Sequence, residues 1–225
     1  MTLDIKCQVV YGNHQFRSKV NFSYSMIQIF GFAILFSIGG ILAEKALYVK
    51  IPSLSEPSSS FPSLPRSFGI FVAILTAFNF WTITYGMNVG IARKKYKEMA
   101  EKNGEKDTEM RYNLPNLYVD GNTKPARAFN CVQRSHQQMM ETLTQFNISA
   151  MLSAFNYPFV AAFLVALHLI SRKVWCRCYA GSEGEPGKRY DHSLSKHIWT
   201  SLLGLLILSF LSGMKFFLGN SVPFL

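Results

Sequence analysis

The sequence predicts an all-α integral membrane protein, and its composition and its uncharged runs carry that prediction. Of the 225 residues, 49% are hydrophobic and only 16% are charged, too few charges to cover an ordinary soluble domain. Four uncharged runs of about bilayer length mark candidate transmembrane helices, at residues 25–43, 67–92, 147–171 and 197–214. This pattern excludes a disordered chain, a secreted disulfide scaffold and a soluble nucleic-acid-binding domain.

Most of the lysines and arginines behind the net charge of +10 lie beside the apolar runs, as they do in membrane proteins. We therefore expect no nucleic-acid partner. Strongly basic loops begin at Arg93 and at Arg172, and basic loops of this length remain on the cytoplasmic side. Between them, the stretch 127–179 would form a helix of roughly 80 Å, far longer than one bilayer requires. It therefore predicts two spans with a break near Pro158, because proline starts helices readily and disfavours helical geometry in the preceding residue.

The five predicted spans divide the chain into three parts. Residues 1–65 form an extension with a membrane anchor at about 25–47 and a connector rich in serine and proline. Residues 66–219 form a four-helix core, with helices at about 67–92, 127–155, 157–178 and 195–217, and residues 220–225 form a tail. The amino terminus is expected inside and the carboxyl terminus outside. The mixed-charge stretch 98–111 is expected to be a solvated helix tail or a mobile loop.

The third predicted span is unusually polar for a membrane helix. Arg134, Gln138, Glu141 and Gln145 recur at spacings that place them along one helical face, with His136 beside it. Ionisable groups at membrane depth cost roughly 2.5–3.5 kcal/mol each, so Arg134 and Glu141 must pair, face water or bind a ligand. A structural ion pair and a ligand-binding cleft are both open at this point.

The position of this polar stripe favours a cleft near the cytoplasmic end of the bundle. The stripe begins within two turns of a basic loop, and Arg93, Arg172, Lys188 and Arg189 are expected at the same membrane face. These cations would form a positive rim, and the glutamate of the stripe would lie deeper. Such a cleft suits a small ligand with several carboxylates and one ammonium group, although a single rim cation more often contacts lipid headgroups.

The cysteines indicate neither a disulfide framework nor a metal site. Cys7, Cys131, Cys176 and Cys178 form no CxxC pair, and no second His or Cys stands at ligand spacing from His136. We therefore expect reduced thiols and no bound metal.

Three segments carry recognisable motifs. They are NVGIARKKYK at 88–97, FNCVQRSHQQ at 129–138 followed by Glu141, and GEPGKR at 184–189. In order and spacing they resemble the MAPEG family, the membrane-associated proteins in eicosanoid and glutathione metabolism. The similarity covers about residues 67–219 and is greatest to the microsomal glutathione transferases of type 3.

The resemblance implies a left-handed four-helix bundle protomer, here with one extra amino-terminal transmembrane helix. It further implies a homotrimer that binds glutathione between neighbouring subunits at the cytoplasmic side. Lipophilic electrophiles or lipid hydroperoxides would arrive from the membrane lipids, so the implied activity is that of a glutathione transferase, with or without glutathione peroxidase activity. The endoplasmic reticulum is the implied location, ahead of a mitochondrial membrane.

The resemblance also implies roles for individual residues. Arg93, Arg134 and Arg172 would surround the carboxylates of glutathione and Glu141 would lie near its ammonium group, while His136, Gln138 and Tyr179 would complete the binding site. Lys188 or Arg189 would be the catalytic cation, because a nearby positive charge favours the nucleophilic thiolate.

A second function is open because the sequence departs from the family pattern. Gln138, Thr144 and Trp175 stand where the family has asparagine, proline and tyrosine, and an indole cannot act as an acid. The loop at 181–183 is also longer than in the family. The alternative is a catalytically weak or inactive structural subunit of a larger membrane complex. A transporter is a weaker third alternative, because no span shows the broken-helix pairs of transporters.

Overall fold

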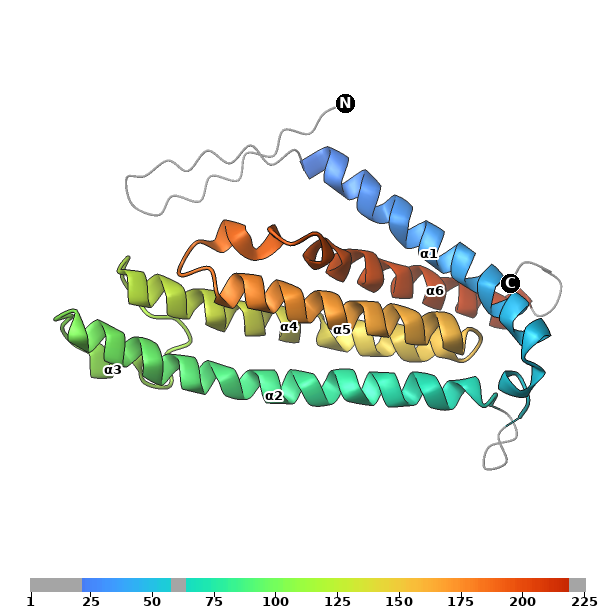
Figure 1. Cartoon of the computed structure of the whole chain (residues 1–225), viewed down its shortest axis with the longest axis horizontal. Helices are drawn as coiled ribbons and strands as arrows, with labels where there is room; N and C mark the ends of the chain where they lie inside the picture. Colours follow the sequence, from blue (N-terminus) through green and yellow to red (C-terminus); the bar gives the residue numbers. More distant parts are fainter. Residues whose placement is uncertain (1–21, 58–63, 219–225) are drawn as a thin grey trace.

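The chain folds into a bundle of long helices that run side by side along one axis (Figure 1). The computed structural model describes residues 22–57 and 64–218, and within these ranges extended backbone pairs at one isolated bridge, between Pro57 and Pro65. The helices are α1 (Phe22–Lys50), α2 (Ser67–Lys102), α3 (Thr108–Tyr112), α4 (Lys124–Ala154), α5 (Pro158–Ala180) and α6 (His197–Leu218), with 3-10 helices η1 (Pro52–Leu54), η2 (Pro186–Tyr190) and η3 (Ser193–Lys196). The predicted all-α fold class is confirmed. The predicted tail 220–225 and Cys7 lie outside the described residues.

Four helical segments are long and apolar enough to cross a membrane, namely Gln28–Lys50, Ser67–Lys102, Pro158–Ala180 and Ser193–Leu218. The 31 residues of α4 are too polar to be among them, although they extend about 46 Å at 1.5 Å per residue. Hydrogen bonds to the apolar helices show that α4 lies beside their membrane-spanning parts. Asn79 of α2 and Asn147 exchange side-chain hydrogen bonds of 3.3 and 3.0 Å, and Ser153 donates to the Leu205 carbonyl of α6 at 3.1 Å. These bonds place α4 among the spanning helices.

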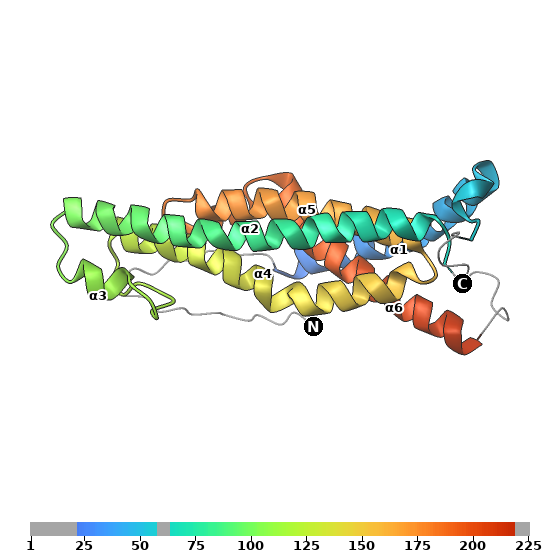
Figure 2. The same ribbon diagram turned by 90° about the horizontal axis from the view of Figure 1, so that it is seen from below.

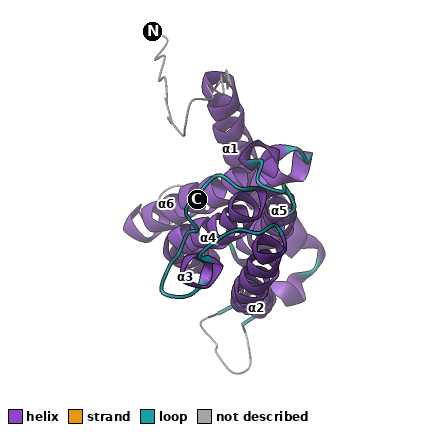
Figure 3. Cartoon of the chain, turned by 90° about the vertical axis from the view of Figure 1, so that its left-hand side faces the viewer, coloured by secondary structure: helices purple, strands orange, loops and turns teal. Residues whose placement is uncertain are grey.

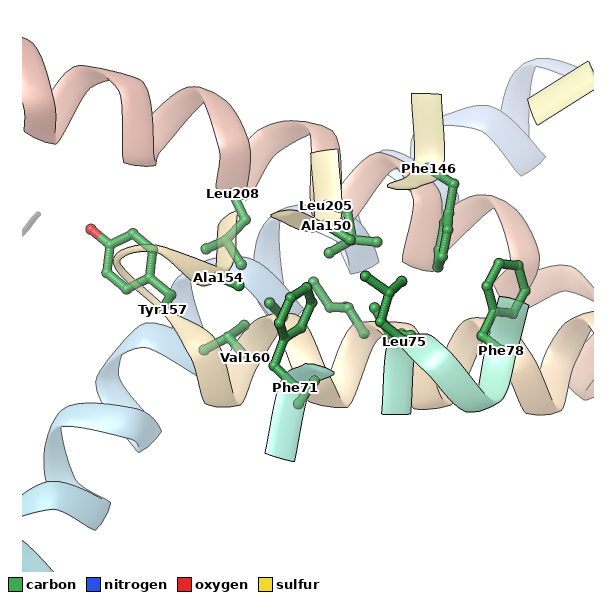
Figure 4. Close-up of a cluster of buried hydrophobic side chains, with 14 of the residues drawn as sticks. Phe71, Leu75, Phe78, Phe146, Ala150, Ala154, Tyr157, Val160, Leu205 and Leu208 are labelled. Atoms are coloured by element: carbon green, nitrogen blue, oxygen red, sulfur yellow. The ribbon is translucent and has the colours of Figure 1, made fainter. Parts of the chain in front are cut away.

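The shared core is built from aromatic, branched aliphatic and small side chains (Figure 4). Phe71 and Phe78 of α2 are buried with Phe146, Ala150 and Ala154 of α4, and the rings of Phe78 and Phe146 have centroids 4.6 Å apart. Lipid is as apolar as these side chains, so helix association in a membrane depends on close packing and on polar bonds between helices. The alanines allow that close approach along α4.

Both basic loops lie at one end of the bundle, which we call the loop end (Figure 2). At the start of α4, Arg127 donates to the Gly184 carbonyl with nitrogen–oxygen distances of 2.8 and 3.2 Å, and Lys124 pairs with Glu183 at 2.8 Å. This ion pair lowers the pKa of the Glu183 carboxyl. Gly184 has φ +92, and a β-carbon there would lie 2.7 Å from Cβ of Arg127, so the contact requires glycine.

The prediction that residues 98–111 form a solvated helix tail or a mobile loop is correct only in part. Helix α2 continues to Lys102, and the short helix α3 then begins at Thr108. Arg111 fixes this region through an ion pair of 2.9 Å with Glu105. Tyr112, at the end of α3, is fully buried, and burial raises the pKa of Tyr112 to about 12. Its phenol is therefore neutral at physiological pH.

Helix α1 packs against α5 and α6, at the edge of the bundle away from α2 (Figure 3). Ser37 donates to the Gly204 carbonyl of α6 at 3.0 Å. Gly40 approaches Val160 of α5 so closely that a β-carbon would meet its Cγ1 at 2.7 Å. No pattern in the sequence of residues 1–65 predicts these contacts between α1 and the four-helix core.

Glu44 of α1 caps the start of α5. It is 4% exposed, and its Oε1 and Oε2 accept the backbone N–H groups of Phe159 and Val160 at 3.2 and 3.1 Å. Tyr48 donates to Oε1 at 2.6 Å. The first N–H groups of a helix have no partner inside that helix, and the helix dipole favours negative charge there. These contacts offset the cost of burying a carboxylate.

Replacing Glu44 with alanine should therefore loosen α1 from the core. Leaving the buried N–H groups of α5 without an acceptor costs about 1–3 kcal/mol, so Tm in detergent should fall by several degrees. Glu44→Gln retains an acceptor oxygen and should lose less. Leu42→Ala, on an exposed position of the same helix, is the matched control. An unchanged Tm for Glu44→Ala would show that the cap contributes nothing.

The common position of the basic loops predicts their membrane side. Lys106→Cys and Lys188→Cys should both react with an impermeant thiol reagent from the cytoplasmic face of sealed vesicles, because basic loops remain in the cytoplasm. A tag added after Leu225 should be accessible only from the opposite face. Reaction of the two cysteines from opposite sides would contradict the five-span arrangement.

Candidate functional site

The polar face predicted for the third span is present on α4, and its two charged residues contact each other. Arg134 Nη1 lies 2.6 Å from Glu141 Oε1, and these side chains are 39% and 45% exposed. Thr144 and Gln145 on the same helix are exposed as well. Lipid cannot solvate an ion pair at membrane depth. Water, a ligand or another protein chain must therefore cover this face.

Arg172 is buried inside the protein, with 1% of its surface exposed, and does not lie in the positive rim that was expected. Its Nη2 donates to Thr142 Oγ1 at 3.1 Å, and its Nη1 donates to Gln138 Oε1. Both partners are neutral, and its nearest electrostatic neighbours carry no carboxylate. The reason for the inward position is helical periodicity, because Arg172 follows the buried His168 by four residues and shares its face.

One nitrogen of this guanidinium and the nitrogen of a neighbouring indole ring are buried donors that lack an acceptor among the described residues. Arg172 Nε and Trp175 Nε1 have no hydrogen-bond partner among the described residues, and the guanidinium carbon lies 5.4 Å from the centre of the indole ring. Buried donors without a partner are rare, because each costs about 1–3 kcal/mol. An anion or a carbonyl oxygen is the kind of group that would satisfy them.

His136 lies on the side of α4 that faces α2, and Arg93 of α2 contacts α4 from that side. A β-carbon at Gly86 of α2 would be 3.0 Å from His136 Nε2. The Arg93 guanidinium donates to a backbone carbonyl at the end of α3 at 2.9 Å, and its carbon lies 4.6 Å from the centre of the Phe129 ring. Two positions along an α-helix turn by about 200°, so His136 and Gln138 point to nearly opposite sides of α4.

Of the two candidate catalytic cations, Lys188 and Arg189, only Arg189 lies against a helix of the bundle in the described part of the chain. Its guanidinium carbon lies 5.7 Å from the centre of the Tyr179 ring and 5.2 Å from that of Tyr190. Lys188 instead pairs with Glu185 at 3.0 Å within the exposed loop, and this contact raises the pKa of Lys188. Tyr179 is buried on α5. The geometry favours Arg189 as the cation nearer to the candidate site.

Two residues near the site were missing from the sequence-based prediction. Thr142 contacts Arg172, and its position one turn after Gln138 on the polar helix could have indicated it. Tyr118, in the loop between α3 and α4, donates from its hydroxyl to Gln137 of α4. Nothing local in the sequence predicts the contact of Tyr118, because it depends on how the loop crosses α4.

Two cavities among the described residues lie away from the predicted site. One cavity of about 240 Å³ is lined by Tyr48 and Asn156 with neighbouring loop residues, and another of about 430 Å³ follows the outer face of α2 at Lys94. Neither is lined by a predicted site residue. Within the described ranges no group of His, Cys, Asp and Glu is arranged to hold a metal, and Cys131, Cys176 and Cys178 are free thiols.

Comparison with known proteins identifies the family. A model described as the MAPEG family matches residues 71–211, which run from α2 to α6 and make up more than half of the chain. No solved structure matches the chain significantly. The chain therefore belongs to the MAPEG family, which includes membrane-bound glutathione transferases and related enzymes.

Proposed function

We propose that this protein is a membrane-bound glutathione transferase that also reduces lipid hydroperoxides with glutathione. The observation that carries the proposal is the buried charge of Arg172, which contacts only neutral groups and has an unpartnered Nε. A buried charge without a counter-charge is costly, and an anionic ligand removes that cost. Glutathione supplies two carboxylates and, after ionisation, a thiolate.

The ion pair on α4 is complementary to the γ-glutamyl end of glutathione. That end carries a carboxylate and an ammonium group on the same carbon. Arg134 and Glu141 present the opposite charges 2.6 Å apart, so each charge can exchange its partner in the protein for one in the ligand. Arg172, held by Gln138, would receive the second carboxylate.

The division of the predicted residues between two sides of α4 supports a site between subunits. Gln138 points away from the side that carries Arg93 and His136, so one chain does not bring these groups together. In a closed ring of identical protomers, one side of each copy meets a different side of the next. A homotrimer would thus complete the site, and it would remove the exposed Glu141 from contact with lipid. This is the assembly that the family resemblance implies.

The proposed chemistry uses the glutathione thiolate. In the transferase reaction the sulfur forms a bond to an electrophilic carbon of a lipophilic substrate, and a leaving group departs or a proton adds to the product. In the peroxidase reaction two glutathione molecules are oxidised to the disulfide, while the hydroperoxide is reduced to an alcohol and water. Arg189 is the residue we assign to thiolate stabilisation. The bilayer supplies the substrate, and the endoplasmic reticulum remains the proposed location.

A structural subunit is the second candidate, and Trp175 is the observation that favours it. Its indole cannot release or accept a proton as a phenol does, and it occupies a buried position beside Arg172. A protein that had retained the fold without turnover would keep its helices and polar bonds and lack a reactive thiolate.

Glutathione binding and turnover by the purified, detergent-solubilised protein test the proposal, with a generic aromatic electrophile and a lipid hydroperoxide as substrates. Arg134→Leu should weaken binding by about a hundredfold, because a charge-assisted bond is worth roughly 1.5–3 kcal/mol. Lys102→Ala, at the exposed end of α2, should bind normally. A wild-type protein that binds no glutathione would overturn the proposal. Normal glutathione binding by a folded Arg134→Leu variant would show that the pair of Arg134 and Glu141 has a structural role only.

A further inference from the structure

We propose that Tyr118 is a positioning residue of this site, which holds Arg134 and Gln137 in the orientation that receives the γ-glutamyl carboxylate. The inference rests on the proposed function, because it assigns Tyr118 a task in binding glutathione. It concerns a loop residue outside the helices that carry the other site residues.

The loop that carries Tyr118 is fixed to α4 by contacts that do not involve Tyr118. Asn130 of α4 binds the backbone of Val119 twice, since its Nδ2 donates to the Val119 carbonyl and its Oδ1 accepts the Val119 N–H, both at 2.9 Å. Arg111 donates to the carbonyl of Asp120. The backbone after Tyr118 is thus held in place, and its ring is presented to α4 with little freedom.

The hydroxyl makes the polar contacts of Tyr118. It donates to Gln137 Oε1, and Gln137 is the neighbour of Arg134 on the surface of α4. A phenol can donate one hydrogen bond and accept another, so the hydroxyl that donates to Gln137 can still accept a hydrogen bond from a neighbouring guanidinium. The residue is 41% exposed, so much of the ring lies outside the apolar core and the hydroxyl makes the polar contact with α4.

These contacts bear on binding because of where Arg134 lies. Arg134 and Gln137 are three residues apart and are neighbours on the helix surface, and Arg134 pairs with the Glu141 carboxylate. When the ligand ammonium engages Glu141, Arg134 gives up part of its contact with that carboxylate. The Tyr118 hydroxyl, fixed beside Arg134 by its bond to Gln137, then offers the guanidinium an acceptor, and this pre-organisation reduces the entropy lost on binding.

Steady-state kinetics with glutathione as the varied substrate test the inference. Tyr118→Phe should raise KM for glutathione about fivefold to tenfold, the loss expected for one or two hydrogen bonds, with kcat changed less than about twofold. Gln137→Met, which removes the acceptor from the α4 side, should have the same effect. Asn130→Ala frees the loop and should also raise KM, and combining it with Tyr118→Phe should add little because both changes break one interaction.

Tyr48→Phe is the matched control, since this hydroxyl bonds to Glu44 and Ser67 in the membrane, away from the loop end, and its loss should leave KM unchanged. Wild-type protein without glutathione binding would defeat the proposed function itself. Wild-type binding together with unchanged KM in both Tyr118→Phe and Gln137→Met would overturn this inference alone. A fall in kcat or in Tm at unchanged KM would also overturn it, because neither comes from weaker positioning of Arg134.

Discussion

Replacing Arg172 with methionine should abolish most glutathione binding while the protein remains folded. Methionine has a similar length without the charge, so the buried space stays filled. Breaking a buried ion pair usually costs about 3–5 kcal/mol because the other charge is left unpaired. Arg172 contacts Gln138 and Thr142, which are neutral, so no opposite charge is left behind. We therefore expect an unchanged or higher Tm.

The loss of affinity should be large, because a buried guanidinium and a carboxylate form charge-assisted bonds of roughly 1.5–3 kcal/mol each. Two such bonds correspond to a decrease of at least a hundredfold in affinity, which titration calorimetry with glutathione can measure. Arg177→Met is the control, since Arg177 is exposed on the same helix. If Arg172→Met binds glutathione within about threefold of wild type, Arg172 serves the fold and the case for a structural subunit becomes the stronger one.

The parts of the fold that could be predicted are those whose signals are local. Uncharged runs located the four apolar helices, and Pro158 located the break between α4 and α5. The flanking charges predicted that both basic loops share one end of the bundle, as Arg127 and Gly184 show by their contact. The spacing of Arg134 and Glu141 predicted a shared face, and one of the two alternatives for them, a direct pair, is present.

The parts that escaped prediction depend on contacts between distant segments. A hydropathy run gives the position of a helix but not which side turns inward, so Arg172 was placed in a rim although it is buried. Glu44 caps a helix that begins more than a hundred residues later, and Tyr118 reaches α4 through the path of a loop. No periodicity within one segment encodes such contacts, because they are fixed by how the helices pack.

The Arg189→Ala variant should lose most turnover at neutral pH and keep most of its affinity for glutathione. A free cysteine thiol ionises with a pKa of about 8.5, and a nearby cation lowers that value because it stabilises the thiolate. The thiolate of the bound ligand should therefore be visible by ultraviolet absorbance near neutral pH in the wild type and largely absent in the variant. Lys188→Ala is the matched control, because Lys188 is paired with Glu185 in the exposed loop and should contribute little.

The loss of turnover in Arg189→Ala should depend on pH. In the wild type, turnover should fall only below neutral pH, where the stabilised thiolate becomes protonated. In Arg189→Ala the same fall should begin about one to two pH units higher, so the loss of kcat is about eightfold to twenty-five-fold at pH 7 and shrinks as the pH approaches 9. A loss of kcat in Lys188→Ala alone would assign thiolate stabilisation to Lys188. An unchanged pH profile in both variants would exclude both loop cations from thiolate stabilisation. Wild-type protein that binds glutathione without forming a thiolate would favour the structural subunit, because binding through Arg134 and Arg172 requires no ionised sulfur.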